Sequence, residues 1–209
     1  MNKNFDCAII GGGLAGLTLA VQLADAGHFV ILFEKEKYPF HKVCGEYISM
    51  ESYDFLERIG IPLSEMKLPM INEVCVSAPN GNTINRKLDL GGFGISRYTL
   101  DSMLASLAVK KGALILEETS VTDVVFENGS FTITAAQNTY HAKVASGAFG
   151  KRSSLDRKLE REKKLSKKNY IAVKYHVKLD FPDNRIELHN FKDGYCGISK
   201  VDDNKYWHI

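Results

Sequence analysis

Three glycines and one glutamate near the N-terminus have the types and spacing that suit binding of a diphosphate and a sugar. Gly11, Gly13 and Gly16 form the pattern GxGxxG, and Glu34 follows Gly16 by 18 residues. In such a pattern the first glycine permits a tight turn, the second lets a pyrophosphate approach the backbone, and the third lets a helix pack on a strand. A glutamate at the position of Glu34 can accept hydrogen bonds from both ribose hydroxyls and repels a 2′-phosphate.

The residues around these glycines predict the elements that must position them. The apolar runs at 5–10 and 29–33 have the length of buried strands, and the stretch between them repeats apolar residues at helical spacing up to Gly27. Strand, glycine turn, helix and strand make a βαβ unit, whose helix N-terminus faces the anion. This unit predicts a dinucleotide, FAD or NAD, and the binding residues that we assign to it are Gly11, Gly13, Leu14, Ala15, Gly16, Glu34 and Lys35.

Length and composition indicate an ordinary globular protein. The chain has 209 residues, enough for one or two domains, and its 44% hydrophobic and 25% charged content excludes collagen-like and disordered classes. With 27 basic and 25 acidic residues the net charge is only +2, which gives no field that would attract nucleic acid. We therefore predict no nucleic-acid partner.

The cysteines and the N-terminal residues predict a cytoplasmic protein. Cys7, Cys44, Cys75 and Cys196 are far apart and form no CxxC pair, which indicates reduced thiols and no metal site. The N-terminus lacks the apolar run of a signal peptide. The uncharged stretch 7–24 contains four glycines, so we expect no transmembrane segment.

The loop that follows the second strand carries a more specific pattern. Tyr38 to Glu46 is irregular, with a proline, a lysine and a glycine, and it is longer than a simple NAD-binding domain needs. From the glycines through this loop, GGGLAGLTLAVQLADAGHFVILFEKEKYPFHKVCGEYIS resembles the opening of the geranylgeranyl reductase-like flavoproteins. That family lies within the FAD-dependent class of aromatic hydroxylases and halogenases. The specific part is PxxKxCG, formed by Pro39, Lys42, Cys44 and Gly45.

The resemblance implies FAD as the cofactor and adds five positions to the site. In such relatives the loop runs along the flavin, which implies that Lys42, Cys44 and Gly45 lie near the flavin or its ribityl chain. Arg97 opens the sequence RxxLD and would be held against FAD, where a guanidinium can bond in bidentate fashion. The strand at Val121 would lie beside the adenine. Without the resemblance, an inert thiol and a solvated charge would explain Cys44 and Lys42.

The rest of the chain predicts an α/β fold with two interleaved sets of elements. We expect a Rossmann-like FAD/NAD(P)-binding domain, with a parallel sheet and a β-meander, from residues 1–70 and 96–155. Part of a mixed-sheet substrate domain is expected from 71–95 and 169–209, with a basic connecting segment at 156–168. Within these, helices are predicted at 51–59 and 100–108, backbone relaxation at 91–94 and a strand over 170–179.

Three side chains are given structural explanations. Phe149 stands where relatives have the aspartate of an Ala-Asp-Gly sequence, which argues against NAD(P)H docking in the hydroxylase manner, and packing against the sheet explains this residue at least as well. His176 and His189 are predicted to be cross-strand surface residues, because the sequence places no carboxylate beside them. The basic segment suits either a solvated face or contact with an anionic, lipid-like molecule.

The resemblance extends only over the first half of such proteins, and no Gly-Asp dipeptide of the second half occurs. Three hypotheses follow. The first is a reductase that transfers hydride from reduced flavin to an apolar unsaturated substrate, isoprenoid or aromatic, with NAD(P)H or another electron donor. The second is a monooxygenase or halogenase, and the third is a non-catalytic nucleotide-binding fragment. Peripheral membrane contact is compatible with all three, and no catalytic residue can be named.

Overall fold

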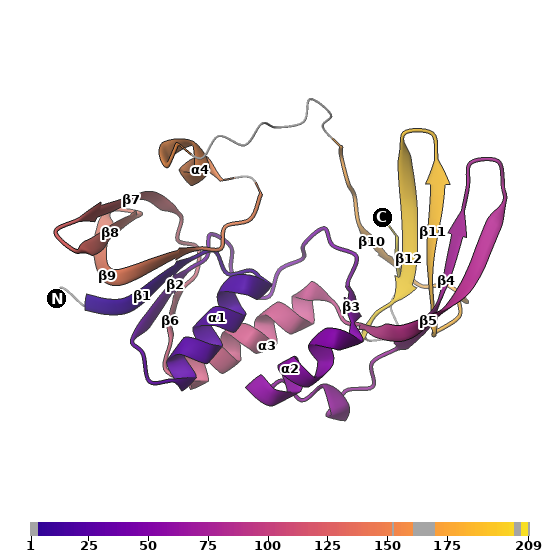
Figure 1. Cartoon of the computed structure of the whole chain (residues 1–209), viewed down its shortest axis with the longest axis horizontal. Coiled ribbons are helices and arrows are strands. Elements are labelled where there is room, and N and C mark those ends of the chain that lie inside the picture. Colours follow the sequence, from indigo (N-terminus) through magenta and orange to yellow (C-terminus); the bar gives the residue numbers. More distant parts are fainter. Residues whose placement is uncertain (1–3, 152, 161–169, 203–205, 209) are drawn as a thin grey trace. The chain divides into compact units, whose positions relative to one another are not determined.

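The computed structural model describes residues 4–151, 153–160, 170–202 and 206–208 (Figure 1). The chain forms two compact units, each made from two separate stretches: Met1–Phe40 with Asp101–Lys168, and His41–Leu100 with Asn169–Ile209. Among the described residues, no helix combines the length and the apolar character that crossing a bilayer requires. Residues 161–168 of the basic segment lie outside the described residues, and its first part contributes to α4 (Ser154–Lys158).

The first unit is built on one sheet that is parallel on one side and antiparallel on the other. Its described strands are ordered β6 (Leu114–Leu116), β2 (Val30–Phe33), β1 (Asn4–Ile10), β9 (Asn138–Gly147), β8 (Ser130–Ala135) and β7 (Val121–Glu127). Strands β6, β2, β1 and β9 are parallel, and β9, β8 and β7 form an antiparallel meander. The predicted Rossmann-like class is thereby confirmed.

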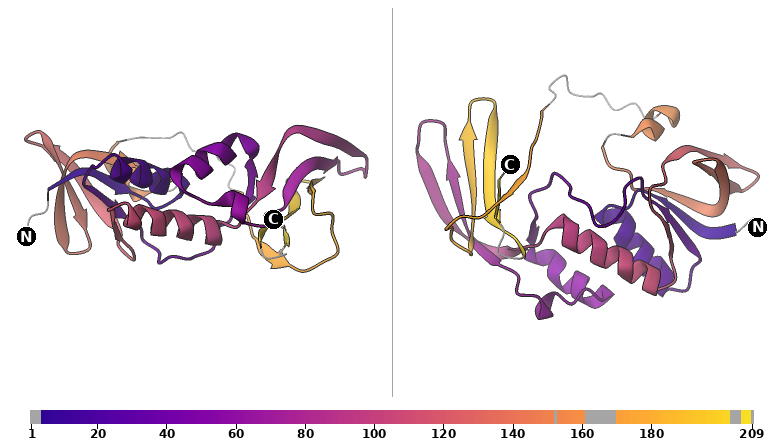
Figure 2. Two further views of the ribbon diagram at one scale, coloured as in Figure 1. Left: turned by 90° about the horizontal axis from the view of Figure 1, so that it is seen from below. Right: turned by 180° about the vertical axis from the view of Figure 1, so that it is seen from behind.

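Two helices lie beside this sheet, as the views in Figures 1 and 2 show. Helix α1 (Leu14–Asp25) buries the face predicted from its spacing, including Leu17, Ala20 and Val21, because its apolar residues recur every three or four positions. Helix α3 (Arg97–Lys110) continues from the second unit into the first. The Lys111 ammonium and the Asp25 carboxylate, near the ends of the two helices, form an ion pair 2.5 Å long.

A buried apolar cluster holds the sheet of the first unit together. Its members come from β1, β2, β8, β9 and α4 and are Phe5, Ala8, Ile10, Ile31, Phe33, Ile133, Ala135, Ala142 and Leu155. Phe149 packs against this cluster, which confirms its interpretation as a packing residue.

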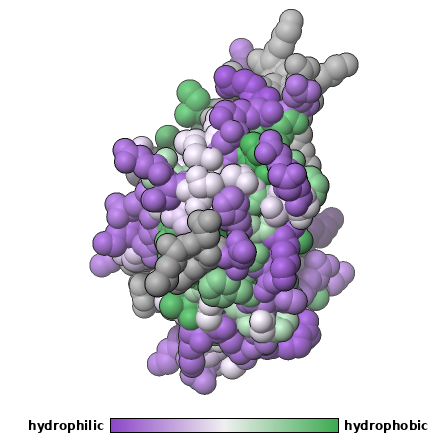
Figure 3. All heavy atoms as spheres, turned by 90° about the vertical axis from the view of Figure 1, so that its left-hand side faces the viewer, coloured by the Kyte–Doolittle hydropathy of each residue, from purple (hydrophilic) through white to green (hydrophobic). Residues whose placement is uncertain are grey.

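The face in Figure 3 is mostly hydrophilic, with small separate apolar patches. In the meander, Phe126 and Val144 are exposed.

A charged pair joins the two central strands of that sheet at its surface. The Lys143 ammonium on β9 donates to the Asp6 carboxylate on β1 at 2.7 Å, and the Phe29 backbone N–H donates to the same carboxylate at 2.8 Å. These two donors, the lysine first, lower the pKa of Asp6 below its usual value. The carboxylate therefore stays charged at mildly acidic pH, although exposed pairs of this kind contribute little to stability.

The second unit contains a mixed sheet. Its described strands are ordered β10 (Tyr175–Val177), β13 (Tyr206–His208), β12 (Gly194–Lys200), β11 (Arg185–Phe191), β4 (Met70–Ser77), β5 (Thr83–Gly94) and β3 (Tyr47–Ser49). Strands β11 and β4 pair in parallel, and the other neighbours pair antiparallel. The short helix α2 (Tyr53–Ile59) follows a 3-10 turn, η1 (Met50–Ser52), and ends at Gly60 in a left-handed conformation; a second 3-10 turn, η2 (Leu63–Glu65), comes next.

Two predictions of local structure in this unit hold only in part. The glycines at 91–94 continue β5, although Gly91 has φ +69° and the pairing register with β4 shifts there, between Ile71 and Glu73. At Gly94 a Cβ atom would lie 2.0 Å from the Lys200 carbonyl oxygen, and at Gly92 2.5 Å from that of Ile48, so small residues permit close pairing. The strand predicted over 170–179 is formed only at 175–177. Lys174, just before it, turns its side chain into a buried ion pair.

Candidate functional site

The glycine turn and the start of α1 form an open helix N-terminus at the carboxyl end of β1. Gly13 is the N-cap, no side chain caps the helix, and its first turn contains no acidic residue. Gly13 and Leu14 are half-buried and Ala15 is exposed, so the first turn is accessible to solvent. Backbone N–H groups at such a position lack helical partners and favour an anion. This end of α1 therefore fits the pyrophosphate of a dinucleotide.

Close backbone contacts explain two of the predicted glycines. Gly11 has φ +106°, in the left-handed region, and a Cβ there would lie 2.5 Å from the Ala148 carbonyl oxygen. A Cβ at Gly16 would lie 2.0 Å from the Gly11 carbonyl oxygen. Because both obstacles are backbone atoms, neither can move aside cheaply. The turn and the helix can approach each other only with glycine at both positions.

Glu34 faces the glycine turn from the end of β2. Its side-chain Oε2 accepts a hydrogen bond from the Gly12 backbone N–H at 2.8 Å, and its Oε1 accepts one from Glu36 N–H at 3.1 Å. Glu34 is only 7% exposed. Each carboxylate oxygen has two lone pairs, so both retain the capacity to accept a further bond. Lys35, by contrast, is exposed, and its Nζ lies 3.9 Å from Oε1 of Glu36.

Gly12 and Tyr38, which were not among the predicted site residues, also shape this turn. The Tyr38 hydroxyl donates to the Gly12 carbonyl oxygen at 2.5 Å. A Cβ at Gly12 would lie 1.9 Å from that hydroxyl and 3.0 Å from Cβ of Glu34. The pattern GxGxxG treats position 12 as free, yet the space around it is filled. The only sequence signal is the run of three glycines, which offers one more glycine than the pattern requires.

Replacing Gly12 with alanine is expected to destabilise the protein by about 1–2 kcal/mol, because the new methyl group displaces Tyr38. The double variant Gly12→Ala/Tyr38→Phe removes the obstructing hydroxyl and should recover part of that loss. Thermal unfolding followed by circular dichroism measures both. A double variant no more stable than Gly12→Ala would show that the conflict lies elsewhere.

The remaining predicted site residues fall in both units. Val121 begins β7 in the first unit and packs against its apolar cluster. Lys42, Cys44, Gly45 and Arg97 belong to the second unit, where the first two are half-buried and Gly45 is exposed. Arg97 begins α3. The proposed contacts of all these residues with a cofactor remain predictions.

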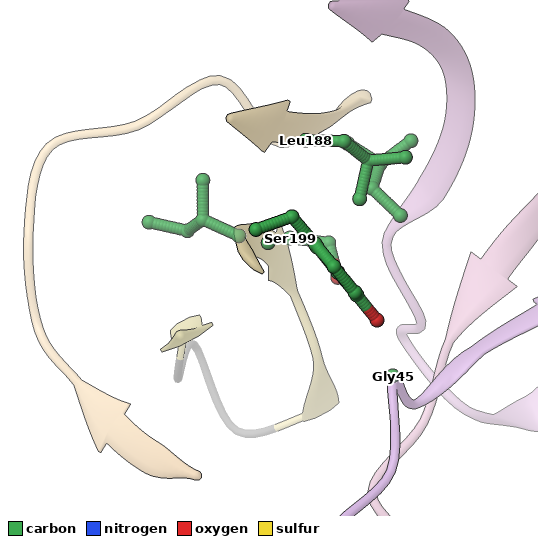
Figure 4. Close-up of a pocket in the computed structure, with 7 residues that line it drawn as sticks. Gly45, Leu188 and Ser199 are labelled. Atoms are coloured by element: carbon green, nitrogen blue, oxygen red, sulfur yellow. The ribbon is translucent and has the colours of Figure 1, made fainter. Parts of the chain in front are cut away.

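A small pocket in the second unit lies between Gly45, in the loop 38–46, and the strands β11 and β12. Figure 4 shows Gly45 of the loop together with Leu188 of β11 and Ser199 of β12. The full lining consists of Gly45, Ile186, Leu188, Tyr195, Gly197, Ile198 and Ser199. Aliphatic and aromatic side chains supply most of it, and no charged side chain lines it. Such a surface suits an apolar molecule.

Both histidines have a carboxylate beside them, so the reason for excluding a charged partner is wrong, although His189, with a side chain 42% exposed and Nδ1 2.9 Å from Oγ of Ser77 on β4, is a cross-strand surface residue as predicted. Nε2 of His176 lies 3.3 Å from Oε2 of Glu46, and Nε2 of His189 lies 2.9 Å from Oε2 of Glu187. The sequence could not show the contact of His176, because residue 46 is far from residue 176 in the chain. Residues 187 and 189 alternate onto one face of β11, a signal that strand periodicity contains.

Burial also raises the pKa of two cysteine thiols and of one tyrosine phenol. All four cysteines are free. Burial raises the pKa of the Cys7 and Cys196 thiols, with Asp6 adding to the effect at Cys7, and burial raises the pKa of the Tyr47 phenol. Cys7 and Cys196 therefore form less thiolate at neutral pH, which makes them poor nucleophiles. Cys44, in the loop, is half-buried.

Comparison with known proteins identifies the family of this fold. The model of the FAD binding domain family matches residues 4–192, nearly the whole chain. The chain belongs to this family. FAD is accordingly its cofactor, which confirms the prediction and decides between FAD and NAD. The open N-terminus of α1 and the buried Glu34 beside it fit the pyrophosphate and ribose of that cofactor.

The chain is also similar in sequence to part of several longer proteins. This chain is 28% identical over 179 residues to conditioned medium factor receptor 1 of Dictyostelium discoideum, and the match covers 74% of this chain and 35% of the relative. It is 32% identical over 135 residues to digeranylgeranylglycerophospholipid reductase of Methanoculleus marisnigri, covering 62% of this chain and 33% of that protein. The matched segments thus span about a third of the length of these relatives.

Solved structures share the fold. A geranylgeranyl bacteriochlorophyll reductase-like protein from Thermoplasma acidophilum superposes with a TM-score of 0.76 at 20% identity, covering all of this chain and 56% of that one. The p-nitrophenol 4-monooxygenase of Pseudomonas putida gives 0.79 at 15% identity, covering 100% and 57%. The predicted resemblance is confirmed at the level of the FAD binding domain family, and the relatives similar in sequence include a reductase, while a reductase-like protein, a halogenase and a monooxygenase share the fold.

Proposed function

We propose that this chain is the FAD-binding part of an oxidoreductase that reduces a carbon–carbon double bond in an apolar substrate. The observation that supports this most is the pocket of the second unit, where Gly45 meets the apolar lining from β11 and β12. The loop of Gly45 is the one expected along the flavin, so an apolar molecule in this pocket would lie beside the cofactor. The reductase names among the relatives favour an isoprenoid chain.

The roles of the chain's own residues follow from their surroundings. The N-terminus of α1 would bind the pyrophosphate, and Glu34 would accept hydrogen bonds from the ribose. Lys42, Cys44, Gly45 and Arg97 would contact the flavin end, and the backbone at Val121 the adenine. When bound and reduced by an external donor, FAD would supply the hydride for one alkene carbon, and the proton for the other carbon would come from solvent. The pocket lined by Ile186 and Leu188 would orient the alkene and exclude water.

A flavin monooxygenase is the second candidate, because the fold is shared with monooxygenases and halogenases. Phe149 argues against the hydroxylase form, since it packs into the apolar cluster and offers no acceptor to a pyridine nucleotide. The electron donor is proposed to be NAD(P)H or another reductant. We also propose a cytoplasmic location with peripheral contact to a membrane that holds the substrate; the free cysteines are compatible with it.

Anaerobic reduction of the purified protein tests this proposal. We expect a yellow protein whose reduced flavin is reoxidised by an unsaturated isoprenoid and only slowly by oxygen, both followed by visible absorption. Rapid oxygen consumption with a hydroxylated product would support the monooxygenase instead. A colourless protein that fails to bind added FAD would overturn both and leave a non-catalytic fragment.

A further inference from the structure

Directly after Gly45, the second unit contains a completely buried carboxylate. Glu46 is 0% exposed. Its backbone has φ 46°, in the left-handed region that residues other than glycine rarely adopt. Its Oε1 accepts a hydrogen bond from the Arg97 backbone N–H at 2.8 Å and lies 2.6 Å from Nζ of Lys174. Its carbonyl oxygen accepts one from Ile95 N–H at 3.0 Å. Glu46 therefore joins the end of the loop to the start of α3.

The charge of Glu46 is compensated by groups from a distant part of the chain. The Lys174 side chain is only 6% exposed, so both members of the ion pair are withdrawn from water. Nε2 of His176, on β10, lies 3.3 Å from the second carboxylate oxygen. Burying a carboxylate is unfavourable unless it is paired and hydrogen-bonded, and here each oxygen has such a partner. The pairing connects the loop to the segment that leads into β10.

The other end of the loop is attached to the same two segments. The His41 ring stacks on Tyr98 of α3, with centroids 4.7 Å apart and an interplanar angle of 27°. It also meets the edge of His176 at 5.1 Å and 74°. Residues 42–45 are thus bounded by His41 and Glu46, and each of these contacts both α3 and β10. These four residues include three of the predicted flavin contacts.

We propose that Glu46 is a positioning residue for FAD: its buried carboxylate holds the loop 42–45 and the N-terminal end of α3 in the geometry that the cofactor requires. The inference rests on the proposed function, in which Lys42, Cys44, Gly45 and Arg97 contact the flavin. A left-handed glutamate with a buried charge is retained only where its surroundings over-determine it, which is typical of functional sites. Glycine would satisfy the backbone alone, so the carboxylate has a further role.

The variant Glu46→Gln tests this with two readouts. It preserves the shape of the side chain and removes the charge that pairs with Lys174. We expect the Kd for FAD, measured by flavin fluorescence, to rise about 10-fold or more. Without FAD, and in a Cys196→Ser background, the rate at which a disulfide reagent modifies Cys44 should rise several-fold, because the loop opens more often. Cys7 and Cys75 are buried and contribute little to that rate.

Asp202→Asn is the matched control. Asp202 is another buried carboxylate at the start of α3, accepting from Ser96 N–H at 2.7 Å and from the hydroxyls of Ser96 and Thr99. Its loss should lower the melting temperature without a selective change in Cys44 reactivity. If the two variants change FAD affinity and Cys44 reactivity equally, Glu46 is merely structural and the inference is wrong. Should Glu46→Gln fail to fold, Glu46→Gln/Lys174→Met removes both buried charges and is expected to give the same two changes.

Failure of this inference differs from failure of the proposed function. If Glu46→Gln binds FAD like the wild type and leaves Cys44 protected, while Glu34→Ala loses FAD affinity, the inference falls and the FAD site stands. If the wild type binds no FAD, the proposed function falls and the inference about the cofactor falls with it. An increased Cys44 rate in that case would still show that Glu46 holds the loop.

Discussion

Replacing Glu34 with alanine is expected to weaken FAD binding by roughly 30- to 150-fold, which corresponds to about 2–3 kcal/mol. The substitution removes a charged acceptor that is oriented by Gly12 and Glu36 and faces the glycine turn. It also removes the buried carboxylate oxygen to which the Gly12 N–H donates. Titration of the apoprotein with FAD, followed by flavin fluorescence, measures the change.

Two controls make this prediction specific. Glu36→Ala removes an exposed carboxylate two residues away and should leave FAD affinity nearly unchanged. Lys42→Ala should weaken FAD binding less than Glu34→Ala, because Lys42 belongs to a loop and Glu34 to the end of a buried strand. If Glu34→Ala and Lys42→Ala are tolerated equally, the assignment of the ribose site to Glu34 is contradicted.

Replacing Gly16 with alanine is expected to destabilise the apoprotein by about 2–3 kcal/mol, which lowers the melting temperature by roughly 5–10 °C. In an ordinary helix the same change stabilises by about 1 kcal/mol, so the sign of the effect is informative. The reason is the Gly11 carbonyl oxygen, 2.0 Å from the new methyl group. Moving it would displace the turn that is proposed to bind the pyrophosphate.

FAD binding should therefore be lost together with stability in Gly16→Ala. Measuring the melting temperature without FAD separates the packing effect from the loss of ligand stabilisation. A variant that melts higher than the wild type would mean that α1 and the turn are less closely packed than the structure shows. It would also remove the steric reason for the third glycine of the pattern.

Sequence periodicity predicted most of the first unit because its signals are local. The glycine spacing, the apolar runs of β1 and β2 and the acid at Glu34 all lie within 30 residues, and the structure forms them as one βαβ unit. The predicted meander also has a local signal, because Asn128–Gly129 is a typical two-residue turn and lies between the paired strands β7 and β8. Contacts with FAD were assigned by resemblance, so for Lys42, Cys44, Gly45 and Arg97 they remain predictions.

What the sequence could not predict depends on contacts between distant residues. Tyr38 fills the space at Gly12 across 26 positions, and Glu46 meets Lys174 across 128. No periodicity encodes such pairs. The run at 170–179 alternates as a strand does, yet Lys174 is used to neutralise a buried acid, so tertiary charge pairing overrides the local pattern.

The parallel pairing of β4 with β11 has a consequence for synthesis on the ribosome. Residues 70–77 emerge long before residues 185–191, so one side of β4 stays without a neighbour while more than a hundred further residues are made. An unpaired strand edge of that duration is a template for association between nascent chains. The β4–β5 hairpin is therefore one part of this molecule at which a chaperone, or slower growth at low temperature, should improve the yield of soluble protein.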